Sequence, residues 1–144
     1  MDPQTCKSFP NENSLCYLAT TDDDQPHVRA LLMWFADDNG FYFGTLSPKN
    51  ISKQLHKNPK VEVCFFKSRE NIMEAKMMRI TGKAEFIYDP KMLDKMYEDR
   101  KFLEEIYGKP IKSFMEVFRI PTGEAHFWMM KDILREPELE RLSF

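Results

Sequence analysis

The sequence has few of the residues that build disulfide frameworks and metal sites. Its 144 residues include only 3 cysteines, Cys6, Cys16 and Cys64. An odd number of cysteines without a C-x-x-C pair favours reduced thiols over disulfides or a zinc site. Cys16 and Cys64 lie in apolar runs and are expected to be inert core thiols rather than nucleophiles. The 3 histidines, His27, His56 and His126, lack the spacing of metal ligands. No metal site is therefore expected.

Neither sign of charge is in clear excess. The 21 Lys and Arg residues nearly balance the 23 Asp and Glu residues, and the formal net charge is −2. The sequence therefore lacks the basic footprint of a nucleic-acid-binding protein and the Lys/Arg-rich amphipathic face of a membrane-surface protein. We expect neither nucleic acid nor membrane as a partner, and any anionic ligand must be held by a local cluster of donors.

Long apolar runs are also missing. The first residues, "MDPQTCKSFPNENS", lack the apolar stretch of a signal peptide, and no apolar run approaches the ~20 residues that span a bilayer. These absences predict a cytoplasmic location. Walker and glycine-rich nucleotide motifs, repeats and linkers are absent as well. The length then predicts one domain over residues 1–144, with a core at about 12–130 and a charged tail at 131–144.

Short apolar segments between turn residues dominate the rest of the chain. Strands are predicted at 14–21, 26–35, 41–46, 60–67, 76–88, 113–120 and 124–130. A short helix is predicted within 47–59, with Ser47 as N-cap and Pro48 as its first residue. A second helix is predicted from Asp89-Pro90 to about Tyr107, with an apolar stripe that includes Met92 and Met96.

Turn chemistry predicts how these strands pair. Asn39-Gly40 suits a type I′ turn, which would pair 26–35 with 41–46, and "PTGE" would join the last two strands in a hairpin. Short turns favour a largely antiparallel sheet closed into a small barrel. The segment "PHVRALLMWF" (26–35) is apolar on both faces, so its outer face must be covered by a helix, a ligand or a second subunit.

One group of donors is placed to bind phosphate. In the predicted hairpin, Arg29 lies opposite residues 45–47, close to Lys49 and the start of the short helix. Backbone N–H groups at a helix N-terminus and an arginine fork are typical of a phosphate site. The alternative is that Ser47 only caps the helix while Arg29 and Lys49 are solvated.

The string "PHVRALLMWFADDNGFYFGTLSPKNISKQLHKNPKVEVCFF", followed by "MRITGKAEF", resembles the FMN-binding split-barrel family related to pyridoxamine 5′-phosphate oxidase. The resemblance covers roughly residues 12–130. It implies a mainly β fold, a six-stranded antiparallel split β-barrel with two flanking helices. It also implies a homodimer with FMN bound between the subunits, so that flavin and partner chain would cover the strand at 26–35.

The resemblance also assigns candidate cofactor-binding residues. These are Arg29, Ala30, Leu31, Leu32, Thr45, Ser47, Lys49, Asn50, Gln54, Arg79 and Trp128. Arg29 and Lys49 match phosphate ligands, although the loop spacing leaves Lys53 as an alternative to Lys49. Residues 30–32 match the strand along the isoalloxazine, Thr45 matches the threonine that ends the return strand, and Ser47 and Asn50 match further phosphate-side donors. Gln54 would reach the flavin from the helix.

Two of these assignments carry an alternative. Arg79 would serve the flavin or only stabilise the sheet. Trp128 would reach the partner's flavin or be a structural residue of the dimer interface.

The tail departs from the family pattern. The oxidase proper carries an Arg-Leu-His substrate signature, whereas this chain ends "KDILREPELERLSF" without the histidine. We therefore expect an FMN-dependent oxidoreductase other than pyridoxamine phosphate oxidase, passing electrons from a reduced donor such as NAD(P)H to a small organic acceptor. No catalytic acid or base is identified. The alternative is a non-catalytic protein on the same barrel that stores or binds a flavin, haem or deazaflavin.

Overall fold

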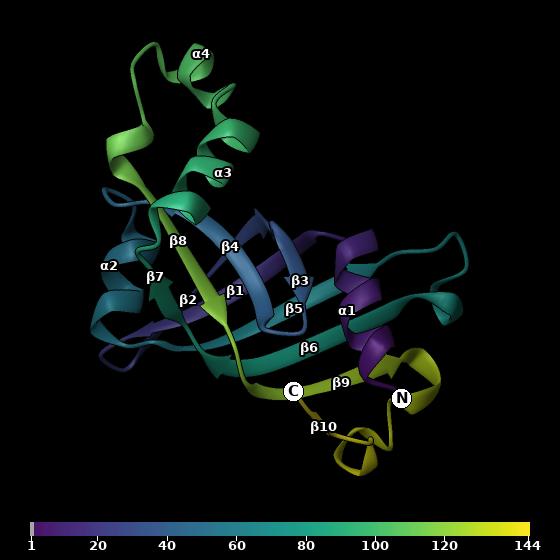
Figure 1. The fold of residues 1–144 in the computed structure, drawn as a ribbon. Coiled ribbons are helices and arrows are strands. Elements are labelled where there is room, and N and C mark those ends of the chain that lie inside the picture. The colour runs from purple at the N-terminus through teal and green to yellow at the C-terminus, as the bar shows by residue number, and fades with distance from the viewer. Residues whose placement is uncertain (1) are drawn as a thin grey trace.

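The computed structural model describes residues 2–144, which form two antiparallel sheets with helices at their flanks (Figure 1). The larger sheet has the order β10-β9-β6-β5-β1-β2. Its strands are β1 (Leu15–Asp22), β2 (Gln25–Leu32), β5 (Lys60–Lys67), β6 (Lys76–Lys83), β9 (Gly123–Met129) and β10 (Leu142–Ser143). The smaller sheet has the order β3-β4-β8-β7. Its strands are β3 (Phe35–Asp37), β4 (Gly40–Leu46), β7 (Glu85–Ile87) and β8 (Met115–Ile120).

Four α-helices accompany the sheets. They are α1 (Pro3–Glu12), α2 (Asn50–Lys57), α3 (Pro90–Arg100) and α4 (Leu103–Tyr107). Figure 1 shows α3 and α4 projecting together beyond the ends of β4 and β8, while α1 lies beside β3. Among residues 2–144, no helix has the length and apolar character needed to cross a membrane.

The prediction of antiparallel strands is confirmed, but the predicted pairing of the strands was wrong in three places. The segment 26–35 is divided between β2 and β3, which lie in different sheets, and 76–88 is divided between β6 and β7. Strands β8 and β9 also lie in different sheets and form no hairpin. The residues at the first crossing explain the change of sheet. Met33 N–H donates to Ser14 O beside β1, whereas Trp34 N–H donates to Tyr42 O on β4.

The predicted closure into one barrel also differs from the structure. The described residues form ten strands and four α-helices, and neither sheet closes on itself. Strands β2 and β10 are the edges of the larger sheet. Because the chain changes sheet within continuous apolar segments, periodicity alone cannot reveal where one sheet ends and the other begins.

The predicted type I′ turn at Asn39-Gly40 was wrong. A type I′ turn needs positive φ at both central residues, but in this turn only Gly40 has positive φ, at 124°. The Asn39 N–H donates instead to Asp37 Oδ1 at 2.8 Å. At Gly40, a Cβ atom would lie 2.3 Å from Ile120 O, so the position requires glycine because of both its φ angle and its neighbour.

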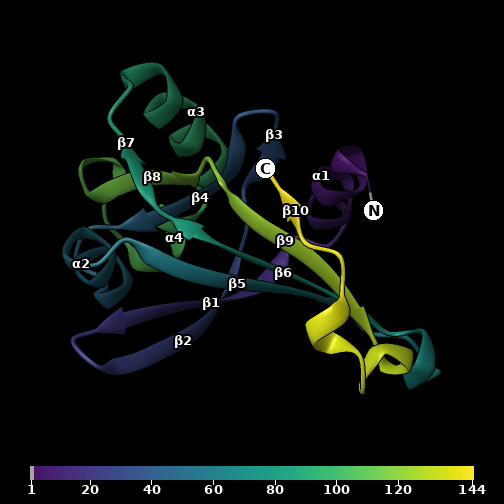
Figure 2. The same cartoon turned by 90° about the horizontal axis from the view of Figure 1, so that it is seen from below.

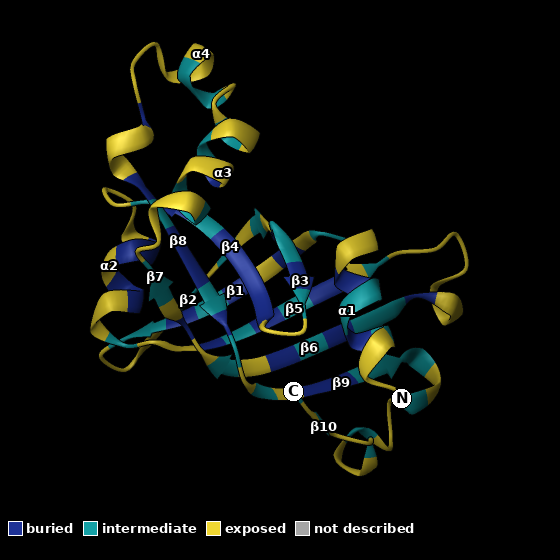
Figure 3. Ribbon diagram, in the orientation of Figure 1, coloured by how far each residue is buried: buried dark blue, intermediate teal, exposed yellow. Residues whose placement is uncertain are grey.

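The main core lies between the two sheets, where β4 and β8 are largely buried (Figure 3). Its largest fully buried aromatic side chains are Phe41, Phe43, Phe65 and Phe118. A second cluster under α3 is built on Tyr42, Met96, Ile111, Met115 and Val117. The burial of Met96 confirms that the methionines of the second helix pack in a core. That helix was predicted as continuous to Tyr107, but it breaks after Arg100 into α3 and α4.

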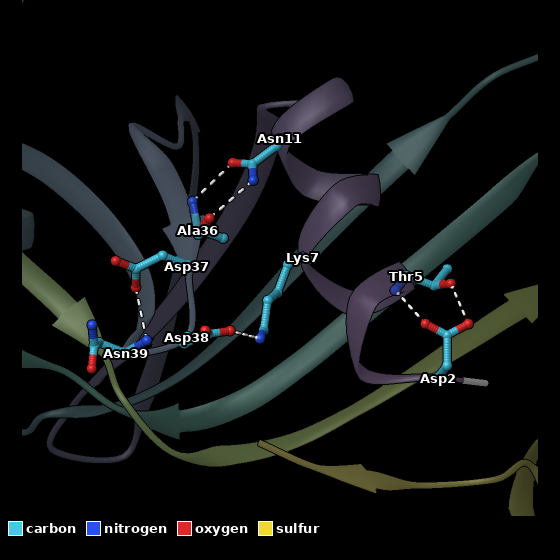
Figure 4. Close-up of polar contacts among 8 residues, drawn as sticks. All are labelled: Asp2, Thr5, Lys7, Asn11, Ala36, Asp37, Asp38 and Asn39. Carbon is cyan, nitrogen blue, oxygen red and sulfur yellow. Dashed lines mark hydrogen bonds and ion pairs between the residues drawn. The ribbon is translucent and has the colours of Figure 1, made fainter.

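Helix α1 was not predicted, because its sequence is polar and contains an internal proline. Asp2 caps it by accepting from Thr5 N–H at 2.9 Å. The Asn11 amide donates to Ala36 O at 2.9 Å and accepts from Ala36 N–H at 2.8 Å, so it pairs with the edge strand β3 as a neighbouring backbone would (Figure 4). Lys7 forms an ion pair with Asp38. These local contacts attach α1 to the smaller sheet.

No disulfide links the three cysteines within residues 2–144, which agrees with the predicted reduced thiols. Cys16 is fully buried in the core, and burial raises its pKa to about 12. Cys64 is half-buried, and burial raises the pKa of its thiol more than the nearby Arg79 lowers it. These thiols therefore stay protonated near neutral pH, which agrees with their assignment as unreactive groups.

Candidate cofactor site

Strand β2 and the start of α2 line a widely open cavity of about 510 Å³, called here the polar cavity. It is lined by His27, Val28, Arg29, Ala30, Pro48, Lys49, Asn50, Ile51 and Gln54. No carboxylate lines it, although the whole chain carries a net charge of −2. The cavity therefore combines two cationic side chains with neutral donors, which is a composition suited to an anion.

Arg29 is held at this cavity by neutral acceptors only. Its Nη1 donates to Thr20 Oγ1 at 2.8 Å and to Leu18 O at 3.3 Å, and its Nη2 donates to Gln54 Oε1 at 2.5 Å. Its Nε makes no hydrogen bond within residues 2–144. Burial lowers the pKa of Arg29 because no negative group compensates its partial loss of water. The positive charge is thus fixed in position and remains without a counter-ion.

The N-terminus of α2 supplies further donors. Lys49, not Ser47, is the N-cap, and no side chain caps the helix. The N–H groups of Ser52 and Lys53 both point to Lys49 O, at 3.1 and 3.4 Å, whereas the N–H groups of Asn50 and Ile51 have no partner in the described part of the chain. Open N–H groups and the helix dipole both favour an anion here.

Ser47 does not cap α2 because the chain makes a further turn before the helix begins. Its N–H donates to Phe114 O at 2.8 Å, and Lys49 N–H donates to Leu46 O at 2.9 Å. The side chain of Ser47 is exposed, and Ser47 lines neither this cavity nor the one described next. The prediction that Ser47 is the helix cap was therefore wrong.

A second cavity of about 330 Å³, called here the apolar cavity, adjoins the first through Lys49, which lines both. It is lined by Leu31, Leu32, Gly44, Thr45, Leu46, Lys49, Met96, Arg100, Phe102, Leu103, Tyr107 and Met115. Thr45 is buried there, and its Oγ1 makes no hydrogen bond in the described structure. The pair of cavities thus combines a polar end, with Arg29 and Lys49, and a largely apolar slot whose wall includes Arg100.

Strand β2 contributes backbone groups as well as side chains. It is an edge strand that pairs with β1 only, so one row of its N–H and C=O groups has no strand partner among residues 2–144. Ala30, Leu31 and Leu32 lie on this edge beside the two cavities. An unpaired strand edge can hydrogen-bond the polar rim of a planar ligand.

The structure brings together eight of the eleven predicted site residues. They are Arg29, Ala30, Leu31, Leu32, Thr45, Lys49, Asn50 and Gln54. The predicted reason for this proximity was wrong, because β2 and β4 are not hairpin partners. They meet instead where the edge of the larger sheet approaches the smaller one. Lys53, the alternative to Lys49, lines neither cavity.

Arg79 and Trp128 lie elsewhere, on the outer face of the larger sheet. Arg79 forms ion pairs with Glu62 and with Glu136 of the tail, the latter at 3.0 Å. Trp128 pairs with Met77 across β9 and β6 and lines neither cavity. In this chain, Arg79 therefore joins the tail to the sheet.

Sequence reasoning missed the residues of α3 and α4 that wall the apolar cavity. They are Met96, Arg100, Phe102, Leu103 and Tyr107. The helix was interpreted as structural because its apolar stripe matched core packing. A signal was nevertheless available: Phe102 and Tyr107 are large aromatic residues next to a helix break, and both remain more than half exposed.

Strands β1 and β2 expose apolar side chains on the face opposite the core. Cross-strand pairing places Leu15 beside Leu32 and Tyr17 beside Ala30, and all but Ala30 are among the exposed large apolar residues of the chain. Val28 continues this row with 69% of its surface exposed. The apolar outer face of residues 26–32 is therefore uncovered in the single chain.

The tail contacts the same outer face of the larger sheet at β6 and β9, away from β1 and β2. In addition to the Arg79–Glu136 ion pair, Arg141 donates to His126 Nδ1 at 2.5 Å. His126 is buried, and its Nε2 has no partner within the described residues. Burial, followed by the charges of Arg141 and Arg79, lowers the pKa of His126. Figure 2 shows the tail turning back so that β10 runs alongside β9.

Comparisons with known proteins agree with this architecture. The chain is 27% identical to the pyridoxine/pyridoxamine 5′-phosphate oxidase of Rippkaea orientalis, over 87% of this chain and 71% of that protein. Its fold resembles a NimC/NimA family protein from Clostridium acetobutylicum, with a TM-score of 0.74, 22% identity and coverage of 98% and 92% of the two chains.

Two further solved structures have the same fold. An FAD-binding protein from Mesorhizobium loti matches with a TM-score of 0.67, 17% identity and coverage of 88% and 94%. The haem storage protein HutZ from Vibrio cholerae matches with a TM-score of 0.64, 18% identity and coverage of 88% and 93%. The family model described as pyridoxamine 5′-phosphate oxidase matches residues 3–129. Together with the two sheets and the paired cavities, this match shows that the chain belongs to the pyridoxamine 5′-phosphate oxidase family.

Proposed function

We propose that the chain is an FMN-dependent oxidoreductase. The observation that carries the proposal is the uncompensated Arg29, held beside the open N-terminus of α2 where the polar cavity leads into the apolar one. A phosphate suits the first cavity and a planar ring system suits the second. The FAD-binding protein with the same fold supports a flavin as the ligand class.

The residues that line the two cavities have the chemistry that FMN would require. Arg29, Lys49 and the N–H groups of Asn50 and Ile51 would hold the phosphate, and Gln54 would keep Arg29 oriented through its 2.5 Å contact. Leu31, Leu32 and Leu46 would line the ring, with backbone groups of β2 at its polar edge. Bound FMN would supply hydride chemistry at its N5 atom, for which the chain needs to provide placement and an open ring face.

We propose further that the protein is a homodimer that completes the site. The uncovered row of Leu15, Tyr17, Val28 and Leu32 would be buried by a second copy, because an apolar face next to a ligand site is unusual for a monomer. Trp128 lies on this same face of the larger sheet. It would then either reach the partner's flavin or pack in the interface.

The substrate is proposed to differ from pyridoxamine 5′-phosphate. That substrate needs a second phosphate site beside the flavin, and the two arginines of the tail are already engaged. Arg141 donates to His126 and Arg135 pairs with Glu138 at 3.2 Å. The proposed reaction is therefore electron transfer from NAD(P)H to a small organic acceptor such as a nitro compound or quinone.

The second candidate is a non-catalytic protein that binds a flavin, haem or deazaflavin. It is favoured by two observations: neither cavity is lined by a carboxylate that could act as acid or base, and HutZ, with the same fold, is a haem storage protein.

The visible spectrum of the purified protein tests both candidates. A flavin spectrum bleached by NADH or NADPH and restored by an acceptor supports the oxidoreductase. Flavin colour without reduction supports the binder, and a Soret band identifies haem. Pyridoxal phosphate formed under air at about 1 per second or faster would contradict the proposed substrate class.

A further inference from the structure

Arg100 is the one cation of the apolar cavity that the proposed flavin site does not use. The cavity has two cationic side chains in its wall, Lys49 and Arg100, and no carboxylate. Lys49 also lines the polar cavity, where it is assigned to the flavin phosphate. Arg100 comes from α3 instead, on the wall that α3 and α4 add to the cavity.

Three acidic residues close to Arg100 in the sequence pair with other groups. Asp99 accepts from Trp34 Nε1 at 2.8 Å, and Glu98 pairs with Lys101 at 2.8 Å. Glu104 accepts from Ile111 N–H at 3.1 Å and from the Tyr97 hydroxyl at 3.2 Å. Among residues 2–144, Arg100 has no hydrogen bond or ion pair. Arg100 is half-buried and lines the cavity, so the wall of the cavity carries a positive charge with no counter-ion among these residues.

The surroundings of Arg100 are aromatic and aliphatic. Phe102, Leu103 and Tyr107 follow it on the helix break and on α4, and Met96 precedes it by one helical turn. Such a wall binds a flat apolar body, while the guanidinium can donate two parallel hydrogen bonds to an oxyanion at its edge. A helix-dipole role for Arg100 would not require it to line a cavity.

We propose that Arg100 binds the anionic group of a planar aromatic substrate, such as an aromatic carboxylate, within the apolar cavity. This inference rests on the proposed flavin oxidoreductase, because it assigns the substrate class of that same site. The substrate ring would lie against the side chains of α4 and the proposed flavin, and Arg100 would fix which edge of the ring points away from the flavin.

The test compares two probes of similar shape and different charge, 4-nitrobenzoate and neutral 4-nitrobenzyl alcohol. Their affinities for the FMN-loaded protein are measured by calorimetry, and the FMN affinity of each variant is measured separately by flavin fluorescence. The wild type should bind the anion roughly tenfold or more tightly than the alcohol, as expected for a charge-assisted pair. Arg100→Gln should bring the two affinities to within about twofold and leave FMN binding unchanged.

Two further variants make the result specific. Lys101→Gln removes the neighbouring cation, which pairs with Glu98 outside the cavity, and should keep the full preference for the anion. Arg100→Lys keeps the charge without the fork and should retain part of the preference. Arg100 is the last residue of α3 and is half-exposed, so neither Arg100→Gln nor Arg100→Lys removes core packing.

Each other outcome has a defined meaning. Equal binding of both probes to the wild type overturns the inference. Arg100→Gln that weakens FMN but keeps the preference for the anion also overturns it, and assigns Arg100 to the flavin. If the protein takes up no FMN, the titrations are made on the chain as purified. A preference for the anion that Arg100→Gln abolishes would then support the anion site while the proposed flavin function fails.

Discussion

Replacing Arg29 by alanine should weaken FMN binding strongly and leave the fold intact. In the structure, Arg29 donates to Thr20 Oγ1, Leu18 O and Gln54 Oε1. Thr20 Oγ1 also donates to Gln54 Oε1 at 2.6 Å. The two buried side chains therefore still satisfy each other after the arginine is removed. We expect the change to cost no more than about 1 kcal/mol of the free energy of unfolding, the value of an ordinary hydrogen bond.

The loss in affinity should be larger, because a dianionic phosphate loses a charge-assisted partner that can donate two hydrogen bonds. A contribution of about 2–3 kcal/mol corresponds to a Kd increase of roughly 30- to 150-fold. The measurement is quenching of flavin fluorescence on titration with apoprotein, made with FMN and with riboflavin, which lacks the phosphate. Arg29→Ala should weaken FMN binding by this factor and riboflavin binding by less than about threefold.

Lys53 provides the matched control. It lies on the same helix, one turn from Lys49, but lines neither cavity. Lys53→Ala should leave the Kd for FMN within about twofold, whereas Lys49→Ala should raise it. Unchanged FMN affinity in Arg29→Ala would refute the phosphate assignment. Equal losses for FMN and riboflavin would show that Arg29 acts through the shape of the cavity rather than through the phosphate.

Three further results are expected. Gly40→Ala should lower Tm by about 6 °C or more, because strain and a clash with the β8 carbonyl cost about 2 kcal/mol, whereas Gly108→Ala, also at positive φ but in open space, should lower it less. The pKa of His126 is lowered in the fold, so the unfolded chain binds a proton at this residue more readily than the folded chain does. The free energy of unfolding should therefore fall as the pH drops from about 6.5 through the folded pKa of His126. In His126→Gln, this contribution to the pH dependence of Tm, measured in thermal melts from about pH 7.5 to about pH 5, should be absent. Leu15→Lys places a charge on the proposed dimer face and should convert the dimer to a monomer in light scattering. Leu134→Lys, on an exposed part of the tail, should leave the dimer unchanged. A wild-type monomer at micromolar concentration would contradict the shared site.

The sequence predicted most strands but could not assign them to sheets. The strand at 60–67 matches β5 residue for residue, because its buried residues alternate with more exposed ones and turn residues bound it on both sides. The segment 76–88, by contrast, continues its apolar pattern through Ala84, where the chain leaves the larger sheet. The Ala84 N–H donates to Pro59 O, outside either ladder. A change of hydrogen-bond partner leaves no trace in hydrophobic periodicity.

Contacts between segments far apart in the sequence were also beyond prediction. Helix α1 has a polar sequence, and it is placed by the paired hydrogen bonds between Asn11 and Ala36, 25 residues apart. The start of α2 was placed too early for a similar reason. Ser47 looks like a cap, but its backbone is held by Phe114, nearly 70 residues later. In both cases a hydrogen bond to a residue far along the chain helps to place the element, and hydrophobic periodicity carries no sign of it.

The proximity of Arg29 and Lys49 was easier to predict than the strand pairing that produces it, and the reason is physical. Arg29 and Lys49 were selected because cationic side chains near a helix start suit a phosphate. That choice does not depend on which strands are hydrogen-bonded to each other. The structure satisfies it because β2 is an edge strand whose inner face carries Arg29 and Leu31, beside the start of α2. The same edge position leaves Val28 and Leu32 exposed on the other face. The edge position of β2 therefore exposes two faces at once, one that lines the cavities of its own chain and one that this chain leaves uncovered.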